Sequence, residues 1–318
     1  MRDEVRSEAS GAGPFVHPAL FYRSMREYME GTVPFVLEGL YSGEPVAVAV
    51  PGARLELLRA QLGARADQVQ WHDMQRAGRN PGRIIPGVLR AFADEHPDRR
   101  VRIIGEPVWP GRTATEYPAC AQHEALINLA FADRPMTILC PYDAARLDAT
   151  ALADAHATHP VTVGGGRLSR SAAYAPDRVV AAYNTLPPPP PDTVPDPFDA
   201  EHLADARHLA TERARRLGLS GERLGDFSLA AGELITNSVV HAGGSGSVGV
   251  WTEDGHVVCE VADAGRLDDP LAGRRPAVRG MPHGRGLLMV HHLADLVRTR
   301  TGADGTRVRF YLRLPSPA

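Results

Sequence analysis

The sequence predicts two domains: an α/β domain with a parallel sheet, then an α+β domain with helices on one face of a mixed, largely antiparallel sheet. Three observations predict this arrangement. The 318 residues are about two domains' worth of chain. A proline-rich stretch interrupts the chain after its middle. Before this stretch single strands alternate with helices, whereas paired strands follow helices after it.

Composition sets the domain boundaries. Residues 1–14 carry charges and small side chains and predict a flexible tail. Residues 186–198 contain a run of consecutive prolines, which excludes a helix or a central strand and favours an extended polyproline II linker. The first domain is therefore expected at 15–185 and the second at 199–318.

The first domain shows the alternation of a parallel α/β sheet. The apolar run at 46–50 is followed by Leu55, Leu58 and Leu62 at helical spacing, and the pattern then recurs. The predicted strands are 46–50, 101–104 and 136–140, and the further predicted helices are 84–96 and 119–132. This alternation predicts one sheet with helices on both faces.

The second domain begins with two helices and continues with strand pairs. Glu253, Asp254 and Gly255 are turn residues and predict a hairpin between two of its strands. The predicted helices are 199–217, 223–241 and 285–295, and the predicted strands are 247–253, 256–263, 296–301 and 306–314.

Composition also excludes several classes of function. The sequence contains no lysine, so a Walker A phosphate loop and Schiff-base catalysis are excluded, because both need a lysine amine. The net charge of −3, without long blocks of like charge, argues against a nucleic-acid or membrane-binding surface. Three widely spaced cysteines indicate reduced thiols. With no apolar segment of membrane-spanning length, a cytoplasmic protein is expected.

A carboxylate and a carboxamide share one face of the second helix of the second domain. Glu233 and Asn237 are four residues apart, so their side chains are neighbours. Asn237 can give an oxygen to Mg²⁺, and Glu233 can accept a proton. Leu234, Ile235 and Val239 are expected to point into the core. Alone, the pair is also what a solvated helix face shows.

Three further segments point to nucleotide binding. Asp263 ends a predicted strand, where its carboxylate suits the exocyclic amine of adenine, and Gly265 permits close approach. Gly284 and Gly286 open the next helix, whose free N–H groups suit phosphate oxygens. Thr306 begins the last strand.

In this order and spacing, the four segments resemble the N, G1, G2 and G3 boxes of the GHKL (Bergerat-fold) ATPases. This superfamily includes histidine kinases, gyrase-type ATPases and anti-sigma-factor kinases. The resemblance covers nearly all of 199–318. The segment from Glu233 to Ala242 is similar to the N box of the anti-sigma serine kinases. His202 and His208, on the first helix, lie in no recognisable phospho-acceptor segment of a histidine kinase.

The resemblance implies ATP and Mg²⁺ as cofactors. It makes Asn237 the Mg²⁺ ligand, Glu233 the candidate general base and Asp263 the adenine-recognition residue. The other nucleotide-binding positions that it implies are Gly265, Gly284, Arg285, Gly286 and Thr306.

The G1 segment departs from the family pattern. It lacks the second glycine often found there, which predicts a less flexible start to the lid at about 267–283. Within this lid Arg274, Arg275 and Arg279 are candidates for a γ-phosphate contact, and the sequence does not choose among them.

The resemblance also implies partners. The family phosphorylates a serine or threonine on a STAS-domain anti-anti-sigma protein and sequesters a sigma factor, so both are expected here. A homodimer through the second domain is implied by family analogy. Two alternatives stay open: a non-catalytic, nucleotide-gated binding switch, and a sensor histidine kinase that signals to a response regulator.

Segments of the first domain resemble the MEDS domain, the DcmR-type sensory module. They include His17-Pro-Ala-Leu-Phe-Tyr22, 78–86, 104–109, 123–128 and Cys140-Pro-Tyr-Asp143. The resemblance covers about 15–160 and implies a ligand sensor with a RecA-like α/β fold that lacks the P-loop. Its ligand is an unidentified small molecule.

Polar residues of the first domain are expected around a sensory pocket near strand ends, where open α/β sheets bind ligands. They are His17, Glu106, His123, Glu124, Cys140 and Asp143. None of the nitrogen or sulfur donors has the tight spacing of a metal-binding motif. Buried, hydrogen-bonded histidines are therefore the favoured interpretation.

Overall fold

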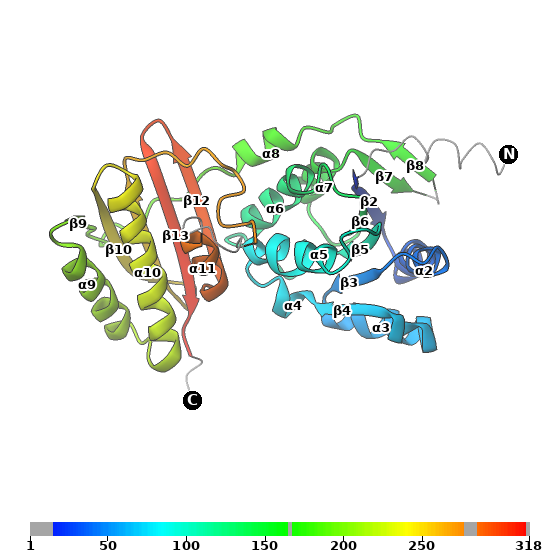
Figure 1. The fold of residues 1–318 in the computed structure, drawn as a ribbon, viewed down its shortest axis with the longest axis horizontal. Coiled ribbons are helices and arrows are strands. Elements are labelled where there is room, and N and C mark those ends of the chain that lie inside the picture. Colours follow the sequence, from blue (N-terminus) through cyan, green and yellow to red (C-terminus); the bar gives the residue numbers. More distant parts are fainter. Residues whose placement is uncertain (1–14, 165–166, 277–284, 316–318) are drawn as a thin grey trace. The chain divides into compact units, whose positions relative to one another are not determined.

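The computed structural model describes residues 15–164, 167–276 and 285–315, and the chain divides into two compact units (Figure 1). Residues 1–78 and 84–183 group into the first unit, and 79–83 and 184–318 into the second. Within the described ranges, no helix combines the length and the apolar character needed to cross a bilayer. The predicted tail, 1–14, lies outside the described residues.

The first unit is built on a mixed, mostly parallel sheet of eight strands. Its order is β4-β3-β5-β6-β2-β7-β8, with β1 beside the start of β6. The strands are β1 (Phe15–Val16), β2 (Pro18–Tyr22), β3 (Val46–Val50), β4 (Val69–Asp73), β5 (Val101–Gly105), β6 (Met136–Asp143), β7 (Val161–Gly164) and β8 (Arg167–Arg170). The predicted parallel sheet is confirmed, with β8 as an antiparallel edge.

Helices cover both faces of this sheet. Those of the first unit are α2 (Met25–Tyr41), α3 (Gly52–Leu62), η1 (Gly63–Gln68), α4 (Met74–Ala77), η3 (Ile85–Arg90), α5 (Ala91–Asp94), α6 (Tyr117–Ala130), α7 (Ala149–Thr158) and α8 (Pro176–Ala182). Residues of α2 and α3 form one apolar core with alternate side chains of β2 to β6, such as Leu20, Ile104 and Leu139. Figure 1 shows α5, α6 and α7 on the other side of the strands.

The second unit contains a five-stranded sheet in which every neighbouring pair is antiparallel. Its order is β12-β13-β11-β10-β9. The strands are β9 (Asp196–Asp199), β10 (Ser245–Glu253), β11 (His256–Asp263), β12 (Leu296–Gly302) and β13 (Gly305–Arg313). Asp254 and Gly255 both have positive φ, 46° and 73°, as a type I′ hairpin turn requires. The expected antiparallel hairpins are confirmed.

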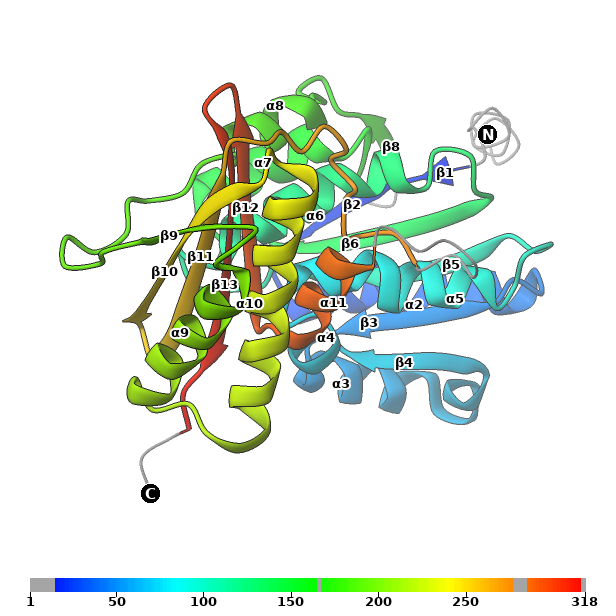
Figure 2. The same cartoon turned by 60° about the vertical axis from the view of Figure 1, so that its left-hand side comes forward.

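The helices of the second unit lie on one face of its sheet (Figures 1 and 2). They are α9 (Leu203–Arg216), α10 (Gly221–His241) and α11 (Gly286–Leu293), and η2 (Pro81–Arg83) also belongs to this unit. Phe227, Leu234 and Ile235 of α10 pack against alternate residues of β11 and β13, among them Cys259 and Phe310.

The predicted linker, 186–198, is wrong at its C-terminal end. Residues 196–198 belong to β9, where Pro197 pairs with Ser247 of β10. Proline lacks an N–H group, so a strand position is open to it at a sheet edge, and β9 is the edge strand. Earlier residues contact the sheet as well, because Arg298 donates to the Thr185 carbonyl.

A buried ion pair within the sheet also contacts the proline-rich stretch. Arg309 is 1% exposed and donates to Glu260 Oε2 from Nε at 3.0 Å and from Nη2 at 2.6 Å. Its Nη2 also donates to the Pro187 carbonyl at 2.9 Å, and its guanidinium lies 4.8 Å from the Trp251 ring. One side chain therefore joins β13, β11, β10 and the proline-rich stretch.

We expect Arg309→Ala to lower the free energy of unfolding of the second unit by roughly 3–5 kcal/mol, because it leaves Glu260 buried without its main partner. Arg215→Ala, which removes an exposed ion pair on α9, should cost less than about 1 kcal/mol. Urea unfolding of the full chain, followed by hydrogen exchange on β11 and β13, measures both. If both variants lost the same free energy of unfolding, the stabilising role given to Arg309 would be contradicted.

Candidate functional site

A cavity of 620 Å³ lies in the second unit between α10, the ends of β11 and β13, and the start of α11. Leu234, Asn237 and Ser238 line it from α10, and Asp263 lines it from the end of β11. The loop after β11 supplies most of the remaining wall. The elements predicted to form a nucleotide site thus meet around one hollow.

Asp263 is held from two sides. The Ser238 hydroxyl donates to Asp263 Oδ2 at 2.6 Å, and the Gly265 N–H donates to Oδ1 at 2.9 Å. The carboxylate is half-buried, and each of its oxygens keeps a second lone pair. It can therefore accept one more hydrogen bond from a ligand in a fixed direction.

The backbone around Asp263 depends on a glycine. Gly305 has a φ of +106°, and a Cβ built there would lie 2.0 Å from the Asp263 carbonyl oxygen. The neighbouring Thr306 sits opposite Asp263 in the sheet and donates to the Gly265 carbonyl at 2.9 Å. A second threonine, Thr301, accepts from the Leu267 N–H. These contacts join the end of β11, the end of β12, the start of β13 and the first residues of the loop after β11.

The opposite end of the site joins α10 to α11. A Cβ built on Gly286 would lie 2.6 Å from Glu233 Oε2 and 3.2 Å from Asn237 Nδ2, so only a glycine fits there without displacement. Asn237, Arg285 and Gly286 line the cavity, whereas Glu233 stands beside Gly286 and is not part of the described wall. The first N–H groups of α11 lack intrahelical acceptors.

The candidate lid arginines differ in position. Arg275 lines the cavity and pairs with Asp269. Arg274 is buried, with 7% of its surface exposed. It lies near His291: burial of His291, together with the positive charges of Arg274 and Arg83, lowers the pKa of that histidine well below its usual value. Arg274 therefore belongs to the interior rather than to the cavity wall. Residues 277–284, which include Arg279 and Gly284, lie outside the described residues.

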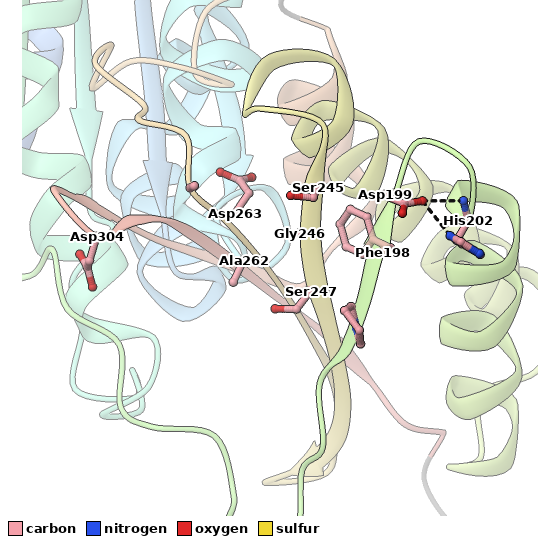
Figure 3. Close-up of a pocket in the computed structure, with 11 residues that line it drawn as sticks. Phe198, Asp199, His202, Ser245, Gly246, Ser247, Ala262, Asp263 and Asp304 are labelled. Carbon is pink, nitrogen blue, oxygen red and sulfur yellow. Dashed lines mark hydrogen bonds and ion pairs between the residues drawn. The ribbon is translucent and has the colours of Figure 1, made fainter.

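A second hollow of 790 Å³ opens beside β9 and β10 (Figure 3). The carboxylates of Asp199, Asp263 and Asp304 line this hollow, and His202 lies among the lining residues as well. The N–H and ring Nδ1 of His202 lie 2.9 Å and 2.8 Å from Asp199 Oδ1. No arginine lines this hollow among the described residues, whereas Arg266, Arg275 and Arg285 line the first cavity. A polyphosphate suits the first cavity better.

The predicted sensory residues contact different partners. Glu106 and Asp143 come together at the carboxyl ends of β5 and β6, where both contact Arg54 of α3. Arg54 lies 5.3 Å and 5.4 Å from the rings of Tyr22 and Tyr28. These charges are buried, and Arg54 forms an ion pair with each of the two carboxylates.

His17, Glu124 and Cys140 form a separate group on the sheet face that carries α6, and His159 completes it. His123 is also buried on α6. The two groups are separated because alternate residues of a strand point to opposite faces, while strand ends point to the edge.

Burial shapes the electrostatics of this histidine group. Burial, with the nearby His159, lowers the pKa of His17 to about 4, so its ring is neutral at pH 7. Burial alone would raise the pKa of Glu124, but the neighbouring His159 and His17 outweigh it and the net shift is downward. Burial and the charge of Glu124 raise the pKa of Cys140 well above its usual value.

Comparison with known proteins agrees with the two resemblances. Residues 16–160 match the family model of the methanogen/methylotroph DcmR sensory (MEDS) domain, and 197–312 match the histidine kinase-like ATPase domain. The anti-sigma F factor of Pasteuria penetrans is 31% identical over 127 residues, which cover 36% of this chain and 85% of that protein. The chain belongs to the anti-sigma factor family of histidine kinase-like ATPases.

A solved structure of the RsbU and RsbW domains of Rv1364c from Mycobacterium tuberculosis is 24% identical, with a TM-score of 0.30. The match covers 40% of this chain and about a third, 34%, of that one. In the present chain, the stretch that matches the ATPase domain follows the stretch that matches the MEDS domain.

Sequence reasoning missed three residues of these sites. Ser238 could have been found as a hydroxyl side chain directly after Asn237, next to the predicted pair of Glu233 and Asn237. Arg54 carries a weaker signal, an arginine in the first turn after a buried strand. His159 carries none, because it follows α7 with no motif around it.

We expect Gly305→Ala to destabilise the ATPase domain by roughly 1–3 kcal/mol, since alanine is strained at this φ and its Cβ meets the Asp263 carbonyl. Gly225→Ala, in α10 with open space around it, should be neutral or stabilising by up to about 1 kcal/mol. Urea unfolding of both full-length variants measures the difference. A Gly305→Ala variant as stable as Gly225→Ala would show that this close approach is not required.

Proposed function

We propose that this protein is a signal-responsive anti-sigma regulator with an ATP- and Mg²⁺-dependent protein kinase domain. Its substrate would be a serine or threonine of a STAS-domain anti-anti-sigma protein, and it would also sequester a sigma factor. The MEDS domain would receive the signal as a small ligand. The family membership of the ATPase domain supports this reading of the partners.

The observation that carries the proposal is the shared cavity of Asp263, Asn237 and Gly286, with Glu233 beside it. Its volume of 620 Å³ falls within the range of about 300–1,000 Å³ typical of small-molecule sites. One end offers a fixed acceptor, and the other offers a helix N-terminus, so a ligand with a base and a phosphate tail suits both.

ATP would then lie with its adenine amine on Asp263 and its phosphates near the start of α11. Asn237 would hold Mg²⁺, which neutralises phosphate charge during phosphoryl transfer. The arginines that line the cavity, Arg266, Arg275 and Arg285, add positive charge on the loop side. Gly286 keeps the space beside Glu233 and Asn237 open.

The chemical step would be an in-line displacement. The hydroxyl oxygen of the target serine or threonine bonds to the γ-phosphorus while the bond to the β–γ bridging oxygen breaks and ADP leaves. Glu233 would accept the hydroxyl proton. Its position beside the start of α11 suits this role.

One observation favours a second candidate function. Glu233 is outside the described cavity wall, so bound nucleotide need not contact it. The domain would then act as a nucleotide-gated protein-binding switch without phosphoryl transfer. The transfer assay below separates the two functions.

A sensor histidine kinase makes a different prediction about the product. Its candidate acceptors lie within the ATPase domain itself: His202 is the N-cap of α9, and His208 lies on that helix. Phosphoserine and phosphothreonine survive acid, whereas phosphohistidine does not. Acid-stable label on the partner supports the serine/threonine kinase, and acid-labile label on this chain supports the histidine kinase.

We expect Asp263→Asn to weaken binding of ATP by about 10–100-fold, because it replaces a charged acceptor of the adenine amine. Asp304→Asn removes a carboxylate found in the second hollow alone and should leave binding unchanged. Titration calorimetry of the full chain with Mg²⁺ and ATP gives both values. If only the Asp304 variant bound ATP more weakly, the nucleotide site would instead be the second hollow, beside β9 and β10.

Glu233→Gln should keep the affinity for ATP within about threefold and slow phosphoryl transfer by about 100-fold or more, as expected for a lost general base. Glu222→Gln is the matched control, since Glu222 is exposed in the first turn of the same helix. Transfer of labelled phosphate from ATP to a STAS-domain protein is the readout. Unchanged transfer in the Glu233 variant would remove this residue from catalysis.

A further inference from the structure

Four buried side chains of the MEDS domain meet at one point. They are His17, between β1 and β2; Glu124 of α6; Cys140 of β6; and His159, at the end of α7. None is more than 1% exposed. One ligand atom from each lies within 4.8 Å of the others. Such a set of imidazole, thiol and carboxylate groups is the donor set of borderline divalent cations.

The separations between the donor atoms suit a tetrahedron. Bonds of about 2.0–2.3 Å to a central Zn²⁺ place neighbouring ligand atoms about 3.3–3.8 Å apart. His17 Nε2 lies 3.3 Å from Cys140 Sγ and 3.4 Å from Glu124 Oε2. His159 Nε2 lies 3.1 Å from the same Glu124 oxygen. These three separations lie close to the tetrahedral range, and all the other separations are below 4.8 Å.

The other nitrogen of each ring is fixed by an oxygen acceptor. Asn128 directs its Nδ2 at the Thr158 carbonyl at 2.8 Å, which leaves its Oδ1 facing His17 Nδ1 at 3.2 Å. His159 Nδ1 lies 2.8 Å from the Ala155 carbonyl. Both Nδ1 atoms therefore donate, and in the neutral rings both Nε2 lone pairs point into the group.

Electron-pair donors thus converge around a single thiol, that of Cys140, which lies 3.3 Å from His17 Nε2. Both Glu124 oxygens and His159 Nε2 are buried, and none of these three atoms has a partner with hydrogen-bond geometry. Buried polar atoms without partners are costly, and a carboxylate most of all. A cation among these atoms would satisfy all of them together.

We propose that His17, Glu124, Cys140 and His159 form a closed, four-coordinate site for a Zn²⁺-type divalent cation. Cys140 would bind as a thiolate, and its thiol proton would be released on binding. All four positions come from the protein, which is typical of structural or sensing sites rather than hydrolytic ones. The ion would join β2, β6, α6 and α7.

The test uses the reduced full-length protein, freed of metal with a chelator and titrated with Co²⁺ as a spectroscopic probe and with Zn²⁺ as competitor. We expect one ion per chain, a thiolate-to-cobalt charge-transfer band in the near ultraviolet, and loss of that band on adding Zn²⁺. Nucleotide is left out, and a cation bound at Asn237 would give no thiolate band. The result is therefore independent of the proposed kinase function.

Cys140→Ser should abolish the band, and Cys120→Ser should keep it. Cys120 is equally buried on α6, one turn before Glu124, and is not part of the group. If Cys140→Ser does not fold, X-ray absorption of the zinc-loaded wild-type protein decides, with one sulfur and three nitrogen or oxygen ligands expected. A folded wild-type protein that takes up no metal, a band that survives Cys140→Ser, or a zinc shell without sulfur would overturn the proposal.

Discussion

The fixed position of one carboxylate organises the ATPase domain. Asp263 ends β11 and is held by the Ser238 hydroxyl from α10 and the Gly265 N–H from the loop. This arrangement requires Gly305 on the adjacent strand, because any side chain there would collide with the Asp263 backbone. The helix layer, the sheet and the loop are therefore joined at the point where we propose that adenine binds.

Much of the ATPase domain could be predicted from the sequence because its signals are local. The four-residue spacing of Glu233 and Asn237 defines a helix face, and Asp254 with Gly255 defines a hairpin turn. The part that failed depends on tertiary context. Residues 196–198 look like linker because of Pro197, yet the edge of a sheet accepts them as a strand.

The first domain was predictable in class but not in its sites. Strands β3, β5 and β6 are predictable as short apolar runs. Arg54, Glu106 and Asp143, in contrast, meet only because parallel strands end at one edge. The histidine group is harder still. His17 and His159 are brought together by the pairing of β2 with β7, a contact that leaves no spacing pattern in the sequence.

We propose that adenine nucleotide occupies the cavity between α10 and α11. Hydrogen exchange of the full-length protein, with and without Mg²⁺ and ATP, tests it most directly. We expect bound nucleotide to slow exchange at the N–H groups of residues 263–267 and at the first turn of α11, and to leave β9 and the start of β10 unchanged. Protection confined to β9 and β10, or no protection anywhere, would contradict it.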